Sequence, residues 1–233
     1  MARYSAAYSD LTVRLEEVGR ITKEAKRNEA KKPLGSQAHL VSALCRGGIV
    51  LLSSHIEGYI TDLNELILER LVKNKVSIKK LSPGFGYYHS RDILNEISKT
   101  SQPEKISQKL KVLYSRDSFV WDDVDFFVEP LDDERFMKGF STPKPEYIYA
   151  LFRRYGCSSL KSDIAKSLTS QFNFHQNNVE TTVHLRNQIA HGDHSLTQTP
   201  DDLKRLTKST QVFCREIDNS VCRWFVNVKC PLR

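Results

Sequence analysis

Long apolar runs are missing from this 233-residue sequence. None approaches the ~20 residues that a membrane-spanning helix needs. The first residues, Met1 to Tyr4, also lack the apolar segment of a signal peptide. We therefore expect a cytoplasmic protein that makes no membrane contact.

Cysteines are too few and too scattered to form a framework. Their number, five, is odd, and no two lie closer than eight residues. This spacing argues against paired disulfides and against a zinc knuckle. The sequence therefore predicts reduced, partly buried thiols at Cys45, Cys157, Cys214, Cys222 and Cys230.

The common phosphate and nucleophile motifs are also absent. The sequence contains no G-x-x-x-x-G-K-S/T, no G-x-G-x-x-G and no G-x-S-x-G. It has no sustained two-residue alternation, no internal repeat and no low-complexity tract. Apolar residues recur instead at three- and four-residue spacing, which is typical of amphipathic helices. The predicted fold is all-α, a bundle of four to five main helices with short accessory ones.

Positive charge dominates most of the chain. There are 35 basic and 28 acidic residues, and eight of the acids lie within residues 117–134, which contain no Lys or Arg. The remaining 20 acids therefore face all 35 bases, a balance that suits a polyanionic partner. The acidic segment could bind a divalent cation, but it lacks the spacing of a calcium loop, so a solvated, partly packed loop is favoured. Its acids are Asp117, Asp122, Asp123, Asp125, Glu129, Asp132, Asp133 and Glu134.

Three long helices are predicted by apolar spacing and by end signals. The first runs from Tyr4 to about Asn28, and the second from Ser36 to about Val72. A third begins at Thr199-Pro200, where a capping hydroxyl precedes a proline. Gly47-Gly48 is unfavourable inside a helix and predicts close approach of another helix. The first helix ends in basic residues that either complement the helix dipole or contact phosphate: Lys23, Lys26, Arg27, Lys31 and Lys32.

We interpret residues 1–233 as one domain and residues 73–145 as an irregular insertion between its core helices. Short helices are predicted at 90–100 and 103–115 inside the insertion. Two more are predicted after it, at Pro145–Tyr155 and Lys161–Leu168.

The densest group of functional residue types lies in residues 183–194. At about 100° per residue, His184, Asn187, Gln188 and His191 share one face of a helix that starts at Asn177 or Asn178. Gly192 is the expected C′ residue, so His191 lies in the last turn. An imidazole titrates near pKa ~6.5 and can transfer protons at neutral pH. Arg186 adds a permanently charged fork suited to phosphate oxygens.

The run Arg186-Asn187-Gln188-Ile189-Ala190-His191, followed by Gly192, resembles the R-x4-H motif of the ribonuclease branch of the HEPN superfamily. Residues 49–59 are similar to the first core helix of these proteins, in which an acid often occupies the position of Glu57. The chain is most similar to stand-alone RiboL-PSP-HEPN-type proteins. The resemblance does not explain residues 73–145.

The resemblance implies a metal-independent endoribonuclease that leaves 2′,3′-cyclic phosphate and 5′-hydroxyl ends and needs no cofactor. Arg186, His191 and Asn187 would be catalytic. The resemblance also implies a toxin, an anti-phage defence protein or an RNA-processing enzyme, with an antitoxin or regulatory protein as a possible partner. Auxiliary substrate contacts are expected from Glu57, His184, Gln188 and His194.

Helix geometry raises one difficulty. Five residues place Arg186 about 140° around the helix from His191, so one ideal helix does not aim both side chains at a single phosphate. A distorted last turn or a second chain must close the gap. The resemblance implies the second chain: a homodimer whose two motifs meet in a composite RNA-binding cleft.

Two other interpretations remain open. A non-catalytic HEPN-type module would use the same side chains to bind a nucleotide, RNA or a protein. A metal site could use His191, Asp193 and His194, although these residues lie across a glycine and no third ligand helix is evident. Glu57 could equally be an internal ion-pair partner.

Overall fold

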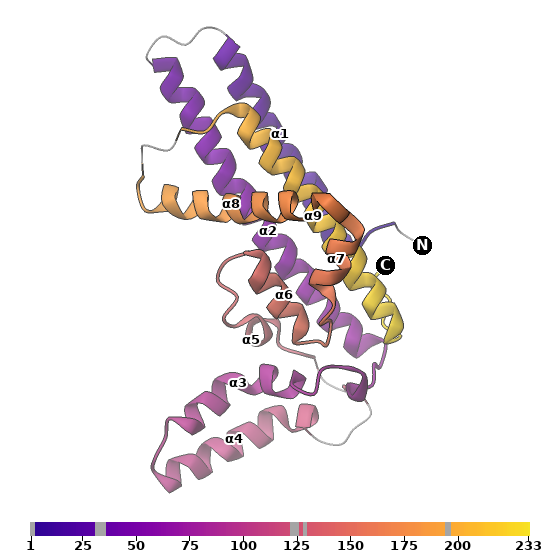
Figure 1. The fold of residues 1–233 in the computed structure, drawn as a ribbon. Coiled ribbons are helices and arrows are strands. Elements are labelled where there is room, and N and C mark those ends of the chain that lie inside the picture. Colours follow the sequence, from indigo (N-terminus) through magenta and orange to yellow (C-terminus); the bar gives the residue numbers. More distant parts are fainter. Residues whose placement is uncertain (1–2, 31–35, 122–125, 128–129, 194–196) are drawn as a thin grey trace.

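The computed structural model describes residues 3–30, 36–121, 126–127, 130–193 and 197–233. Within these ranges a bridge between Ser77 and Phe126 is the only β contact, and every named element is helical. The predicted all-α fold is confirmed (Figure 1). The elements are α1 (Ala6–Ala30), α2 (Ser36–Lys73), the 3-10 helix η1 (Ile78–Lys80), α3 (Phe85–Ser98), α4 (Pro103–Trp121), α5 (Asp133–Met137), α6 (Pro145–Arg153), α7 (Leu160–Leu168), η2 (Thr169–Gln171), α8 (Phe172–Ala190) and α9 (Pro200–Asn227).

Helix α2 is the central helix of the bundle. Helices α1, α8 and α9 all pack on it, and α1 lies along much of its length (Figure 1). The apolar stripe predicted for this helix is the core: Ile56, Tyr59 and Leu63 are fully buried. The Tyr59 hydroxyl donates to the Cys214 carbonyl oxygen of α9 at 3.2 Å, which satisfies its polar atom inside the core. All five cysteines are free and buried, in agreement with the prediction of thiols.

The two adjacent glycines of α2 have different surroundings. A Cβ on Gly48 would lie 2.5 Å from the Leu203 side chain of α9, so the close helix approach predicted here is confirmed for this glycine. A Cβ on Gly47 would meet nothing within 4 Å. Only one of the two glycines therefore serves helix packing.

We expect opposite effects from alanine at these two positions. Gly47→Ala should stabilise the protein by roughly 0.5–1 kcal/mol, because Ala loses less backbone freedom in a helix. Gly48→Ala should be destabilising by about 1 kcal/mol net, since Leu203 is fully buried and overpacking usually costs more than the helix gains. Urea denaturation of both variants measures the difference. If Gly47→Ala and Gly48→Ala stabilised the protein equally, the Leu203 side chain would be able to move aside at no energetic cost.

Helix α2 also meets a composition test for membrane spans. Its residues Ala38–Lys73 are long and apolar enough to cross a bilayer, and they form the one such helix in the described ranges. The sequence prediction considered only uninterrupted apolar runs, and His55 and Glu57 interrupt the apolar residues of this helix. Ile56 and Tyr59 of this helix are fully buried beneath the other helices, and the structure is compatible with a soluble protein.

Residues 73–145 contain more regular structure than the sequence predicted. Helices α3 and α4 pack against each other, and Figure 1 shows this hairpin projecting from the end of the bundle opposite the last turns of α1. Both helices had been predicted, but α3 begins at Phe85 and α4 continues to Trp121. Helix α5 connects the hairpin to the bundle through packing on α3 and on α2.

The acidic segment is not simply a solvated loop. Asp117 is fully buried and accepts hydrogen bonds from Arg116 (2.8 Å) and Arg135 (3.2 Å). Asp132 caps α5 by accepting from the Arg135 backbone N–H at 3.1 Å. The expectation of a solvated loop is therefore wrong for Asp117, whose partners flank the acidic run on either side. Asp122, Asp123, Asp125 and Glu129 lie outside the described residues.

Candidate functional site

The motif helix α8 starts earlier than predicted. It begins at Phe172, directly after η2, and Asn178 lies buried in its second turn. The Asn178 amide donates to the Phe174 carbonyl oxygen at 2.8 Å, and its side-chain oxygen accepts from Arg205 of α9. The predicted cap at Asn177 or Asn178 is wrong, because the amide of Asn178 joins two helices instead of starting one.

The end of α8 agrees with the prediction. Gly192 has a φ of +82°, which favours glycine, and His191 is the residue at which helical geometry ends. The Gly192 N–H donates to the Ile189 carbonyl oxygen (3.1 Å), and the Asp193 N–H donates to that of Gln188 (3.1 Å). This pair of bonds is the Schellman arrangement. It holds the backbone of the last turn while the His191 side chain remains exposed.

Arg186 is half-buried and supported by its neighbour. Its Nη1 donates to the Asn187 side-chain oxygen at 3.1 Å. Within the described residues no carboxylate forms a salt bridge with Arg186, whereas Arg205 of the adjacent helix α9 pairs with Asp202. A positioned guanidinium whose charge is not neutralised can receive an anion such as a phosphate.

The structure brings the other predicted residues together only in part. His184 is exposed one turn before Asn187 and Gln188, both of which are half-buried. Glu57 lies on α2, half-buried, and its backbone carbonyl accepts from Thr61 Oγ1 at 3.1 Å. Within the described part of the chain, the Glu57 side chain forms no hydrogen bond or salt bridge with Arg186 or His191. His194 lies outside the described residues.

The neighbouring His55 fits a structural role. Burial lowers its pKa, and the Glu17 carboxylate, 3.4 Å from its Nε2, opposes that change without reversing it. A half-buried imidazole whose charged form is disfavoured is a poor phosphate ligand. His55 therefore packs α2 against α1 and is not part of the site.

Metal ligation has little support within the described ranges. In that part of the chain no three His, Cys, Asp or Glu side chains come together to hold an ion. The metal interpretation also needs His194, which is not described.

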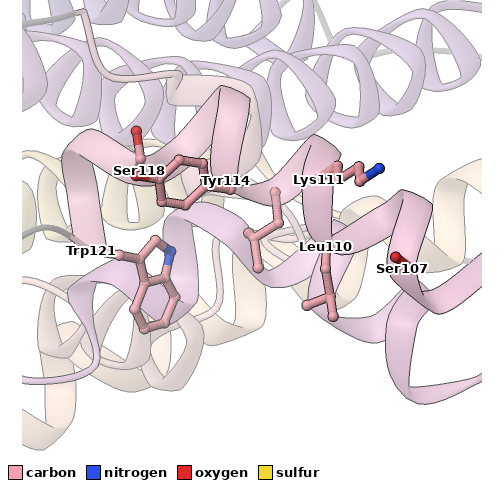
Figure 2. Close-up of a pocket in the computed structure, with 7 residues that line it drawn as sticks. Ser107, Leu110, Lys111, Tyr114, Ser118 and Trp121 are labelled. Atoms are coloured by element: carbon pink, nitrogen blue, oxygen red, sulfur yellow. The ribbon is translucent and has the colours of Figure 1, made fainter.

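A separate hollow of about 590 Å³ lies along α4 (Figure 2). Leu110 and Tyr114 line it beside Lys111, and Trp121 closes one end, where its indole N–H donates to Ser90 Oγ at 2.9 Å. The lining is mostly apolar and holds no acid–base pair. Helix α4 packs chiefly on α3, at the far end of the molecule from α8 (Figure 1). This hollow is not part of the R-x4-H site.

Sequence reasoning missed two features near the motif helix. Arg205, on the next helix, bonds both Asn178 and Asp202, and it therefore links α8 to the start of α9. Lys204 and Lys208, on another side of α9, line a groove with α1. The i,i+4 spacing of the two lysines was visible in the sequence, but their proximity to α1 was not.

Comparison with known proteins supports the resemblance seen in the motif. The family model described as RiboL-PSP-HEPN matches residues 9–223, which include every main helix of the bundle and residues 73–145. No curated protein and no solved structure matches the chain. A match over nearly the whole length, with the R-x4-H motif at the capped end of α8, shows that the chain belongs to the RiboL-PSP-HEPN family.

Proposed function

We propose that this protein is a metal-independent endoribonuclease. The proposal rests chiefly on one observation: Arg186 is braced by Asn187 without a carboxylate partner among the described residues, and an exposed His191 follows it at the capped end of the same helix. A phosphate-binding cation near a proton-transferring group is what RNA transesterification requires. Membership of a HEPN family adds support.

The reaction needs two proton transfers and one charge-stabilising contact. A base removes the proton from the 2′-hydroxyl, and the 2′-oxygen attacks the adjacent phosphorus. The bond from phosphorus to the 5′-oxygen breaks, and an acid protonates that oxygen. The products are a 2′,3′-cyclic phosphate and a 5′-hydroxyl. We assign proton transfer to His191, charge stabilisation on the phosphate to Arg186, and orientation of the guanidinium to Asn187.

A homodimer completes the proposed site. One helix holds Arg186 and His191 about 140° apart, so the arginine of one copy and the histidine of the other serve one phosphate more readily than the two residues of a single copy. Glu57, His184, Gln188 and His194 are proposed as auxiliary residues of the composite cleft.

The proposed cellular role is that of a toxin, a defence nuclease or an RNA-processing nuclease in the cytoplasm, held in check by an antitoxin or regulatory protein. The net charge of +7 is consistent with RNA as the substrate.

An assay in excess EDTA tests the proposal. Purified protein should cleave labelled single-stranded RNA and leave cyclic-phosphate ends, and a matched oligonucleotide with 2′-deoxyribose throughout should stay intact. Binding without cleavage would support a non-catalytic HEPN-type module instead. Cleavage that requires added Mg²⁺ or Mn²⁺ would contradict the metal-independent mechanism.

A further inference from the structure

Basic residues of α9 lie beside the basic end of α1, a proximity that the sequence did not reveal. Lys23 and Lys26 of α1 face Lys204 and Lys208 of α9 across a groove of about 320 Å³. Helices α1 and α9 pack against each other, so the groove lies between two firmly held helices (Figure 1). Four lysines from segments about 180 residues apart in the chain thus line one surface.

Most of this charge is not neutralised by the protein. Lys23, Lys204 and Lys208 form no salt bridge with any carboxylate in the described part of the chain. Lys26 pairs with Asp201 at 2.5 Å, at the first turn of α9. The hydroxyls of Thr22 and Thr207 already donate to backbone carbonyls within their own helices (2.8 Å each). The ammonium groups and the Gln211 side-chain amide are therefore the donors that the groove offers to a ligand.

The surface inside the groove is mainly carbon, but it belongs to glycine, threonine, lysine and glutamine residues, and the four ammonium groups supply its charge. These residue types favour a phosphate backbone over a protein or a membrane. Protein interfaces derive most of their affinity from a few buried Trp, Tyr and Arg side chains, and none of the residues that line this groove is of these types. Stable membrane attachment likewise needs an apolar insertion beside the basic residues. Lysines placed along two helices, without apolar anchors, match the salt-dependent and sequence-independent binding of nucleic-acid backbones.

We propose that the α1–α9 groove binds the sugar–phosphate backbone of the RNA substrate outside the cleaved bond. This inference rests on the proposed ribonuclease function. The groove is distinct from the R-x4-H site, since Arg205 contacts α8 from one side of α9 while Lys204 and Lys208 face α1 from another. A flanking stretch of RNA held here would raise affinity for longer substrates without taking part in the chemistry.

The test measures binding of a labelled oligouridine as a function of salt, in a His191→Ala background in which cleavage should be slowed. Each lysine–phosphate contact contributes about 0.7 to the slope of log K against log salt, so Lys23→Gln/Lys204→Gln should reduce the slope by about 1.4 and the affinity at physiological salt roughly tenfold. The control Lys99→Gln/Lys105→Gln removes the same charge from the α3–α4 hairpin and should leave the slope nearly unchanged.

Two further variants separate charge from folding. Asp201→Asn frees Lys26 and should tighten binding, a gain that misfolding cannot produce. Gly19 lines the groove with open space around its Cβ position, so Gly19→Glu should weaken binding while the equally sized Gly19→Gln should not.

Unchanged affinity and slope in Lys23→Gln/Lys204→Gln would overturn the groove proposal, even if the wild type cleaves RNA. The same variant can be tested on anionic phosphatidylserine vesicles. If Lys23→Gln/Lys204→Gln lost vesicle binding but kept RNA binding, the groove would be a membrane-binding surface and the proposal would be overturned. A wild type that binds RNA through these lysines but never cleaves would instead contradict the proposed ribonuclease activity and leave the groove proposal standing.

Discussion

His191→Ala should lower the rate of RNA cleavage by about 10²–10⁴-fold, because a positioned general acid or base contributes that much. The imidazole is exposed at the end of α8, so its removal should leave the fold intact. Single-turnover cleavage in EDTA, with thermal melting as the check on folding, measures the effect. A rate within a few-fold of wild type would remove His191 from the mechanism.

Arg186→Ala should cost about 10²–10³-fold in the same assay, the range typical for loss of one charge-stabilising group. Arg186→Lys should recover only part of the rate, since an ammonium keeps the charge but loses the planar fork. The matched control for His191→Ala is His39→Ala, because His39 is also an exposed histidine but lies on α2 outside the motif. It should cleave like the wild type.

Mixing the two inactive variants tests the composite site. A dimer of one Arg186→Ala chain and one His191→Ala chain retains one arginine and one histidine on opposite copies. If the pair acts across the twofold axis, the mixture should regain a measurable fraction of wild-type activity. No recovery after subunit exchange would place both groups in one copy. In cells, a toxic wild-type gene beside a harmless His191→Ala gene would support the proposed toxin or defence role.

Asp117→Asn should destabilise the protein by about 3 kcal/mol. Asp117 is fully buried, and the substitution leaves Arg116 and Arg135 without their shared carboxylate. Breaking a buried ion pair typically costs 3–5 kcal/mol, and the lower end applies because both arginines can reach water. Urea denaturation followed by circular dichroism measures it. Asp92→Asn, which removes a more exposed partner of Arg116, should cost about 1 kcal/mol or less. Equal effects would contradict the role of burial.

The same carboxylate should make stability depend on pH. Burial acts to raise the pKa of Asp117, but hydrogen bonds from Arg116 and Ser90 outweigh it and lower the pKa below its ordinary value. A lowered folded-state pKa adds stability that is complete above the unfolded value of about 3.9 and is lost as the pH falls through the folded value. The stability gap between the wild type and Asp117→Asn should therefore narrow below about pH 4.

The elements that could be predicted were those with strong local signals. Thr199 caps α9 through a reciprocal pair of bonds with Asp202, a pattern readable from four adjacent residues. Gly192 ends α8 because a positive φ favours glycine. The long amphipathic helices α1 and α2 were predicted to within two residues, since one continuous apolar stripe defines each of them.

The features that could not be predicted depend on contacts between distant segments. Asp117 looked solvated, because charged residues are rarely buried unless paired, and Arg135 reaches it only through the packing of α5. Asn178 was predicted as a helix cap, but its side-chain oxygen accepts a hydrogen bond from Arg205 of α9, which is 27 residues away in the chain. The R-x4-H motif was located from sequence alone. In the proposed homodimer, the distance from Arg186 to the histidine of the other copy would be set by packing between the two copies.

The length of α2 bears on how assembly is measured. At 1.5 Å per residue its 38 residues extend about 57 Å. A compact sphere-like protein of this size has a radius of gyration near 17 Å, which corresponds to a diameter of about 45 Å. Helix α2 alone is longer than that, so a single copy is elongated (Figure 1). Elongated particles elute early from a size-exclusion column, so the apparent mass of one 26.8 kDa chain would be too high. Multi-angle light scattering measures molar mass independently of particle shape and therefore distinguishes a monomer from a dimer.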